Sequence, residues 1–221
     1  MNPRIKHFSQ KELSPHDNAL LKEWIGLDEL YNKRRAENPQ MPSITYRIGR
    51  KNVLGLPIAY EITYRCKSII GVTKGEAPHE PIYGYEHKMR IILPRAYPSA
   101  DGNPEFKFVT DIWHPNIRYS GRFKGRVCLT MKEMGVLASL KTLVLRVEEY
   151  LKWKLYHAQN TYPYPEDLEV ALWVREEAEP RGWTHFAQNA EKQDFLTEVV
   201  YEPQQEINIA AQNQNPLKFS T

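Results

Sequence analysis

The chain has 221 residues, of which 41% are hydrophobic, 26% charged and 11% aromatic. These apolar side chains are enough for a buried core, which excludes a wholly disordered chain. The 11 Gly and 16 Pro follow no period, which excludes a collagen-like chain. Lys and Arg number 30 against 27 Asp and Glu, and the resulting charge of +3 is too mild to predict a nucleic-acid partner.

Two cysteines, Cys66 and Cys128, are too few for a disulfide scaffold, which favours a reducing compartment. Residues 1–10 are polar and lack the apolar segment of a secretory signal. No stretch approaches the roughly 18 apolar residues that a membrane helix needs. We therefore expect a cytoplasmic protein that acts without a membrane or nucleic acid.

The first half of the chain predicts one helix and four strands. Ser14 before Pro15 is typical of a helix start, and apolar residues then recur at helical spacing as far as Ala36. Alternating apolar and polar residues follow, which predicts strands around residues 44–48, 60–66, 89–93 and 106–108. The connections, including turns at 71–84 and 94–104, are short enough for an antiparallel meander.

Residues 110–137 show no sustained period and predict a long ordered loop, of a kind that is often functional. Helical spacing returns at Leu140 after the expected N-cap Ser139, and a last helix follows Pro165. The fold class is α+β: an N-terminal helix, a four-stranded antiparallel meander, a long loop and C-terminal helices on one face of the sheet. We expect one domain over residues 1–180 and a polar extension over 181–221 that is partly ordered or docked.

Candidate chemistry is concentrated in the long loop. Cys128 lies outside any periodic element, beside Gly125 and the cation Arg126, and a nearby positive charge favours the thiolate form of a cysteine. Cys66 falls instead on the apolar face of a predicted strand, where a cysteine is usually structural. Two such widely spaced cysteines also lack the ligand spacing of a zinc site, so no metal is expected.

His114 and Asn116 could serve a reactive Cys128 in two ways. The histidine could act as its base, as in a cysteine hydrolase. Alternatively, the Asn116 amide could donate a hydrogen bond to an oxyanion that forms on a Cys128 thioester. Both residues could equally satisfy the backbone groups of their own loop, as Asn readily does.

The same loop resembles a known signature. His114-Pro115-Asn116, with Cys128 twelve positions after Asn116, resembles the active-site signature of ubiquitin-conjugating enzymes, the E2 family. Three neighbouring segments resemble the motifs that flank it: Leu93-Pro94 with Tyr97-Pro98, the strand from Pro104 to Thr110, and Gly125-Arg126-Val127-Cys128-Leu129. The motifs cover about residues 94–129, and the order of elements extends the resemblance over about 15–177.

The resemblance implies a UBC-like fold and E2 chemistry. Cys128 would accept the C-terminus of a ubiquitin-like protein as a thioester from an E1-like activating enzyme. An amine, usually a lysine of a protein substrate, would then attack that thioester. Asn116 would stabilise the oxyanion or hold the nearby loop, and His114 would brace its own turn. ATP is consumed by the activating enzyme, so no cofactor is implied for this chain.

The sequence departs from the family pattern in two places. Residues 134–140 lack the tryptophan and the serine-proline-alanine stretch that the family uses in part to meet E3 ligases. Where the family often has a gate residue, the chain has Tyr162-Pro163-Tyr164-Pro165-Glu166-Asp167. Glu166 or Asp167 could assist the incoming lysine, but both also suit the first turn of a helix.

The first helix would be the E1-docking element, through Lys22, Lys33, Arg34 and Arg35, although cations near a helix end are also typical of a solvated surface. The divergent middle of the chain and its polar tail together resemble the E2-like proteins of bacterial ubiquitin-like conjugation operons, some of them linked to antiphage defence. Two alternatives stay open. One is a UBC-fold module that only binds a ubiquitin-like partner, and the other is a cysteine hydrolase that uses Cys128 and His114.

Overall fold

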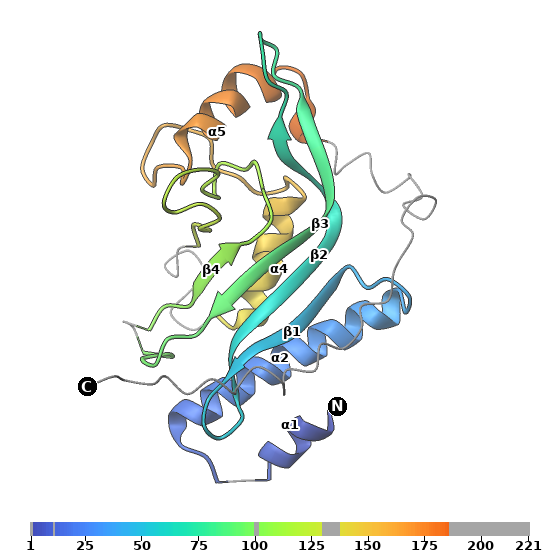
Figure 1. Ribbon diagram of the computed structural model, residues 1–221, viewed down its shortest axis with the longest axis vertical. Helices are drawn as coiled ribbons and strands as arrows, with labels where there is room; N and C mark the ends of the chain where they lie inside the picture. Colours follow the sequence, from blue (N-terminus) through green and yellow to red (C-terminus); the bar gives the residue numbers. More distant parts are fainter. Residues whose placement is uncertain (1, 11, 100–101, 130–137, 186–221) are drawn as a thin grey trace, which may run out of the picture. The chain divides into compact units, whose positions relative to one another are not determined.

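The computed structural model describes residues 2–10, 12–99, 102–129 and 138–185 (Figure 1). Its helices and strands, in chain order, are α1 (Pro3–Phe8), α2 (Pro15–Glu37), β1 (Ile44–Lys51), β2 (Pro57–Val72), β3 (Pro81–Ile92), β4 (Glu105–Phe108), α4 (Leu140–Leu151) and α5 (Leu168–Trp173). A π-helical turn continues α5, and a 3₁₀ turn closes the described chain at Trp183–His185. Most of the expected extension 181–221 and part of the expected loop 110–137 lie outside the described residues.

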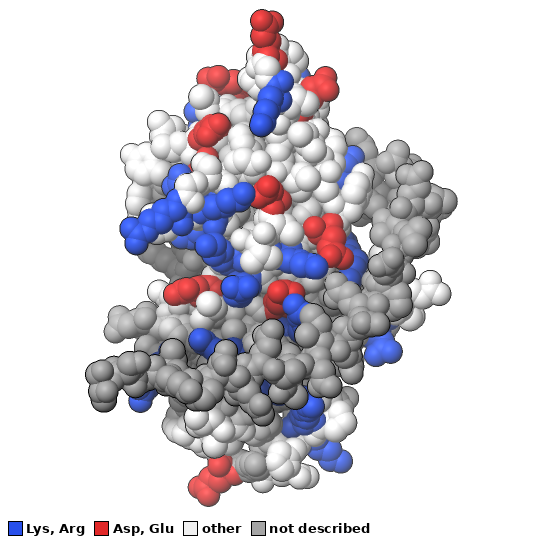
Figure 2. Space-filling model, viewed as in Figure 1, with Lys and Arg blue, Asp and Glu red and all other residues white. Residues whose placement is uncertain are grey.

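The four strands form one antiparallel sheet in the order β1-β2-β3-β4, which confirms the predicted meander and the α+β class. One row across the sheet faces the core and joins Tyr46, Ile62, Met89 and Phe108. The adjacent row has the opposite orientation and consists of charged residues: Arg47, Glu61, Arg90 and Lys107. Figure 2 shows side chains of both charges on the face of the molecule that is seen in Figure 1.

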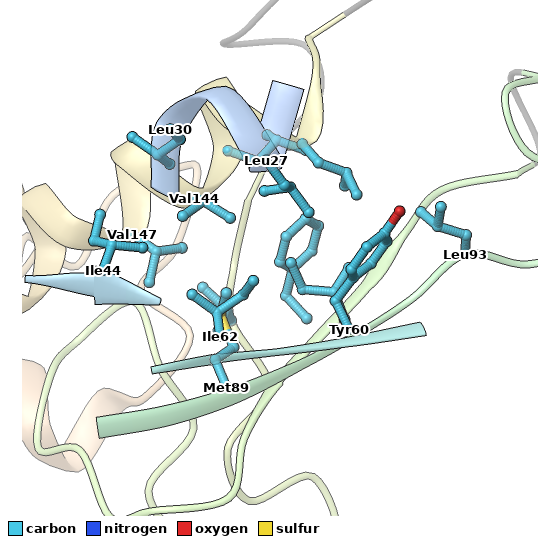
Figure 3. Packing of buried hydrophobic residues seen from close by; sticks show 14 of the residues in the cluster. Leu27, Leu30, Ile44, Tyr60, Ile62, Met89, Leu93, Val144 and Val147 are labelled. Atoms are coloured by element: carbon cyan, nitrogen blue, oxygen red, sulfur yellow. The ribbon is translucent and has the colours of Figure 1, made fainter. Parts of the chain in front are cut away.

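Two helices cover the apolar face of the sheet. Leu27 of α2 and Val144 and Val147 of α4 belong to one buried cluster with Ile62 and Met89 of the strands (Figure 3). The predicted start of α2 is confirmed. Its N-cap is Ser14, whose hydroxyl accepts a hydrogen bond from the backbone N–H of Asp17 at 3.1 Å. The helix therefore begins where capping chemistry allows and turns its apolar stripe toward the sheet.

The β2–β3 hairpin is longer than the sequence predicts. Strand pairing continues as far as Val72 and Pro81, so the turn expected at 71–84 is much shorter. The extra length packs against α5 and the turn that follows it. The indole N–H of Trp173 donates to the carbonyl oxygen of His79 at 2.9 Å, and the His79 ring lies 2.8 Å from the carboxylate of Glu177.

The sequence prediction is also incomplete at both ends of the described chain. Helix α1 is not predicted, because residues 1–10 are mostly polar. In the structure, Ile5 and Phe8 of this helix are buried against α2 and the core. In the last helix, Leu168 and Leu172 follow the predicted apolar period but point to solvent. Within the described ranges, none of the helices combines the length and the apolar character needed to cross a membrane.

Candidate active site

His114 is locked inside its own turn. Its ring is fully buried, lies parallel to the Tyr150 ring at a centroid distance of 5.2 Å, and meets the edge of Trp153 at 4.9 Å. Its Nδ1 accepts a hydrogen bond from the backbone N–H of Asn116 at 3.1 Å. Burial lowers the pKa of His114 to about 3, so the ring is neutral at physiological pH. These contacts hold the turn and keep the ring away from solvent.

The turn and Cys128 are joined by backbone pairing. The N–H of Cys128 donates to the carbonyl oxygen of Asn116 at 2.8 Å, and Ile117 forms an antiparallel bridge with Val127. The intervening residues 118–126 fold back on themselves as a hairpin loop, closed by the Arg118 N–H, which donates to the Arg126 carbonyl at 2.9 Å. Asn116 and Cys128 are therefore neighbours in space although twelve positions separate them.

Gly125 fixes the return of this hairpin loop. Its φ is +83°, in the left-handed region that favours glycine, and a Cβ at this position would run into the backbone oxygen of Phe108. Both backbone polar groups of Gly125 are hydrogen-bonded: its N–H donates to the carbonyl oxygen of Arg118, and its carbonyl oxygen accepts from the N–H of Phe108. The glycine therefore sets the position of Cys128 three residues later.

A cavity of about 220 Å³ opens beside Cys128. Three segments line it: the turn and hairpin, helix α4, and the loop between α4 and α5. The described residues on its wall are Asn116, Cys128, Arg146, Tyr150, Leu155, Tyr156, His157, Pro163 and Tyr164. A chain that enters this cavity to reach the sulfur therefore meets an amide, a guanidinium and several aromatic rings.

The Asn116 side chain anchors the loop on the far wall of the cavity. Its Oδ1 accepts a hydrogen bond from the backbone N–H of His157 at 2.9 Å. This bond leaves the amide nitrogen of Asn116 as its donor group. Asn116 is thus placed both to position the loop and to donate a hydrogen bond within the cavity.

Glu166 and Asp167, the two candidate gate residues, form contacts outside the cavity. Asp167 is the N-cap of α5, where its carboxylate accepts from the N–H of Val170 at 3.2 Å and from the N–H of Tyr119 at 2.9 Å. Glu166 lies 2.8 Å from the guanidinium of Arg126 and also contacts Arg118. Neither is among the described residues that line the cavity. Their contacts fit the helix-start interpretation and the anchoring of the hairpin loop.

Cys66 and Cys128 are both partly exposed, but their surroundings differ. Cys66 packs against the core, and burial raises the pKa of its thiol to about 12. Its sulfur is consequently in the thiol form at neutral pH. These properties fit the structural role that its place on the strand predicts.

The four cations of α2 do not form one free patch. Arg34 pairs with Glu148 at 2.7 Å and with Glu37 at 3.1 Å, and its side chain is largely covered. Lys22, Lys33 and Arg35 are exposed. Arg34 therefore joins α2 to α4, whereas the other three are available at the surface.

The sequence prediction includes Pro163 and Tyr164 of the cavity wall only as part of the segment 162–167. Five other residues of the cavity wall are missing from the sequence prediction: Arg146, Tyr150, Leu155, Tyr156 and His157. Arg146 and Tyr150 lie four positions apart, so helical spacing places them on one face of α4. The sequence alone does not indicate that this face meets Cys128. Leu155, Tyr156 and His157 come from an irregular loop and show no sequence pattern.

Comparisons with known proteins give a partial match. Ubiquitin-conjugating enzyme E2 K from Homo sapiens, Mus musculus and Bos taurus is 30% identical to this chain over 115 residues, which cover 49% of the chain and 52% of each relative. The chain thus spans about half the length of the curated relatives it matches. The crystal structure of a "putative ubiquitin conjugating enzyme" from Plasmodium yoelii covers 76% of this chain and 94% of its own, with a TM-score of 0.45 and 24% identity. No family model matches the sequence.

The similarity to E2 K agrees with the resemblance carried by His114-Pro115-Asn116 and the later Cys128. It comes from sequence alone and extends well beyond those four residues. Over about half of its length, this chain is similar in sequence to ubiquitin-conjugating enzymes.

Proposed function

We propose that this chain is an E2-type conjugating enzyme that carries a ubiquitin-like protein on Cys128. The observation that supports this most directly is the backbone bond from Cys128 to Asn116, with both residues on the wall of one cavity. A thioester formed there has an amide donor beside its carbonyl. That is the arrangement which acyl transfer requires.

The reaction has two steps. The Cys128 thiolate attacks the carbonyl carbon of the thioester on an E1-like enzyme, forms a new C–S bond and releases the E1 thiolate. A neutral lysine amine of a protein substrate then attacks the same carbonyl, the C–S bond breaks, and Cys128 leaves as a thiolate. The amine nitrogen loses one proton to solvent. Because a thioester is already activated, positioning and one oxyanion donor provide most of what the second step needs.

The hydrolase alternative is not supported by the state of His114. A base for the Cys128 thiol needs a ring nitrogen within hydrogen-bond reach of the sulfur. The Nδ1 of His114 accepts from Asn116, and the ring is buried with its pKa lowered to about 3. His114 is proposed here to brace the turn. The exposed Lys22, Lys33 and Arg35 of α2 are proposed as contacts for the E1-like enzyme.

The proposal is tested by incubating the full chain with ATP and the E1-like and ubiquitin-like proteins encoded in the same genome. A covalent adduct on a non-reducing gel that disappears with dithiothreitol is the expected result. It should be lost in Cys128→Ala and kept in Cys66→Ala, which is the matched control. If the E1 carries the modifier but the wild-type chain acquires none, a non-catalytic binding module replaces this proposal.

The narrower expectation, a bacterial operon with an antiphage role, rests on the divergent middle of the chain around residues 134–140 and on the polar tail 181–221. Both segments lie largely outside the described residues. Genes for an E1-like and a ubiquitin-like protein beside this one would support it. Phage plaque counts with and without Cys128→Ala would test the defence role itself.

A further inference from the structure

Arg146 is the cation on the wall of the cavity that holds Cys128. Its guanidinium lies over the ring of Tyr150, 5.7 Å from the ring centroid. Its Nε is buried and has no hydrogen-bond acceptor among the described residues. A buried donor on a charged group is costly when it is unsatisfied, so the unpaired Nε requires an explanation.

The carboxylates near Arg146 in sequence are engaged by other cations. Glu148 lies 2.7 Å from Arg34 and 2.8 Å from Lys152, and Glu149 faces Lys154 at 3.8 Å. No Asp or Glu is among the described residues that line the cavity. Among the described residues that line it, the cavity therefore has one Lys or Arg side chain and no carboxylate to neutralise it.

The hairpin loop that leads to Cys128 adds further positive charge. It carries Arg118, Arg122, Lys124 and Arg126. Glu166 pairs with two of these cations and Asp111 with Lys124, while exposed Arg122 faces only the Phe123 ring among its described contacts. Figure 2 shows basic side chains gathered over the region where the chain continues beyond β4. The hairpin loop thus carries four cations against two paired carboxylates, and this excess of positive charge favours an acidic partner over a basic one.

We propose that Arg146 binds a carboxylate of the acceptor, so that this chain prefers nucleophiles flanked by acidic residues. The inference rests on the proposed function and names the class of its substrate. A guanidinium presents paired N–H donors in the geometry of a carboxylate, and the bond is strongest in a partly covered site. Arg146 and Cys128 line the same cavity, so an acceptor bound beside the sulfur lies in the cavity that holds the guanidinium.

The test uses the full chain, first charged with its ubiquitin-like protein and then separated from E1 and ATP. Discharge is followed with two matched probes, the acetylated and amidated tripeptides Glu-Lys-Glu and Gln-Lys-Gln. The wild type should discharge to the acidic peptide about tenfold faster or more, as expected for one charge-assisted hydrogen bond. Arg146→Met should reduce this ratio to near one, and Arg146→Lys should retain part of it.

Two controls keep the outcomes separate. Arg50→Met removes an exposed cation of β1 and should keep the full preference, which excludes an effect of net charge alone. Discharge is measured only from the fraction of Arg146→Met that carries the modifier, so its charging rate does not enter the ratio. An Arg146→Met chain that keeps the preference overturns the inference. A variant that charges slowly and discharges equally slowly to both peptides also overturns it, because Arg146 would then act on the modifier.

Failure of the inference can be told from failure of the proposed function. A wild-type chain that forms no thioester contradicts both, and this is seen before any peptide is added. A wild-type chain that charges normally but discharges at equal rates to the two peptides contradicts the acceptor preference alone.

Discussion

The side-chain oxygen of Asn116 accepts a hydrogen bond from the backbone N–H of His157, 2.9 Å away, and this bond spans two walls of the cavity beside Cys128. The oxygen holds the loop between α4 and α5. The amide nitrogen is the donor that we propose for the oxyanion, so the two proposed roles belong to different atoms. Substitutions that keep one group and remove the other can tell these roles apart.

Asn116→Asp keeps an acceptor for His157 but removes the N–H donor and adds a negative charge. We expect lysine discharge from the charged protein to slow by about 100- to 1000-fold, as for loss of one oxyanion donor. Charging should persist, because a thiolate is a stronger nucleophile than an amine. The measurement is the rate of adduct loss with free lysine.

Asn116→Ala removes both groups and supplies the control. It should discharge as slowly as Asn116→Asp and should also expose the 155–164 loop to faster amide hydrogen exchange, since the anchor to His157 is lost. Wild-type discharge in Asn116→Asp, with the loop still protected, would contradict the oxyanion role. It would leave Asn116 as a loop anchor only.

The two cysteines should differ sharply toward an alkylating reagent. With its pKa raised to about 12, Cys66 is ionised in only about one molecule in 10⁴ at pH 8, and the thiolate is the reactive form. Both cysteines are partly exposed, and Cys128 lies on the cavity wall, so the expected difference rests on the suppressed ionisation of Cys66. Limited iodoacetamide treatment followed by peptide mass spectrometry should therefore label Cys128 first. Equal labelling in the folded protein would contradict this placement of Cys66.

Gly125 and Gly121 provide a matched pair in the hairpin loop, since both have positive φ. Gly121→Ala meets nothing within 4 Å and should lower the free energy of unfolding by only about 1–2 kcal/mol, the cost of a left-handed φ. Gly125→Ala adds a clash with the Phe108 backbone, and we expect roughly 3 kcal/mol or more. Urea denaturation measures both, and equal losses would contradict the close approach.

Sequence periodicity predicts the helices and strands whose buried residues recur at regular intervals along the chain. The stripe of α2 and the rows that join Ile62 to Met89 are examples. The long β2–β3 hairpin could not be predicted in this way, because its outer end is stabilised by α5. The bond between His79 and Glu177 spans 98 positions. No local pattern reports such a contact.

The same distinction holds for the candidate site. A tripeptide signature and a later cysteine lead to Asn116 and Cys128, which the hairpin loop then brings together. Arg146 has no motif, and only the packing of α4 puts it on the wall of the same cavity. Conversely, Glu166 and Asp167 suit two interpretations in sequence, and their contacts with Arg126 and Val170 favour anchoring and capping. Tertiary contacts decide between alternatives that spacing leaves open.

His114 predicts an acid-dependent loss of stability. The pKa of a free histidine is 6.5, and burial lowers that of His114 to about 3 in the folded chain. Between pH 3 and pH 6.5 the unfolded state therefore binds more protons than the folded state. The free energy of unfolding should therefore fall as pH decreases below about 6.5, by up to about 1.4 kcal/mol per pH unit from this residue. Above pH 6.5 its contribution should be constant.

Other histidines also contribute to the pH profile, so a variant is needed to isolate this one. Burial lowers the pKa of His87, which acts in the same direction. The bond with Glu177 raises the pKa of His79, whose contribution is instead lost as pH rises above about 6.5. His114→Asn keeps an acceptor for the Asn116 N–H and removes the titrating ring. Urea denaturation between pH 4 and 8 should show a shallower acid slope in this variant. Parallel slopes would mean that His114 is not held neutral in the folded chain.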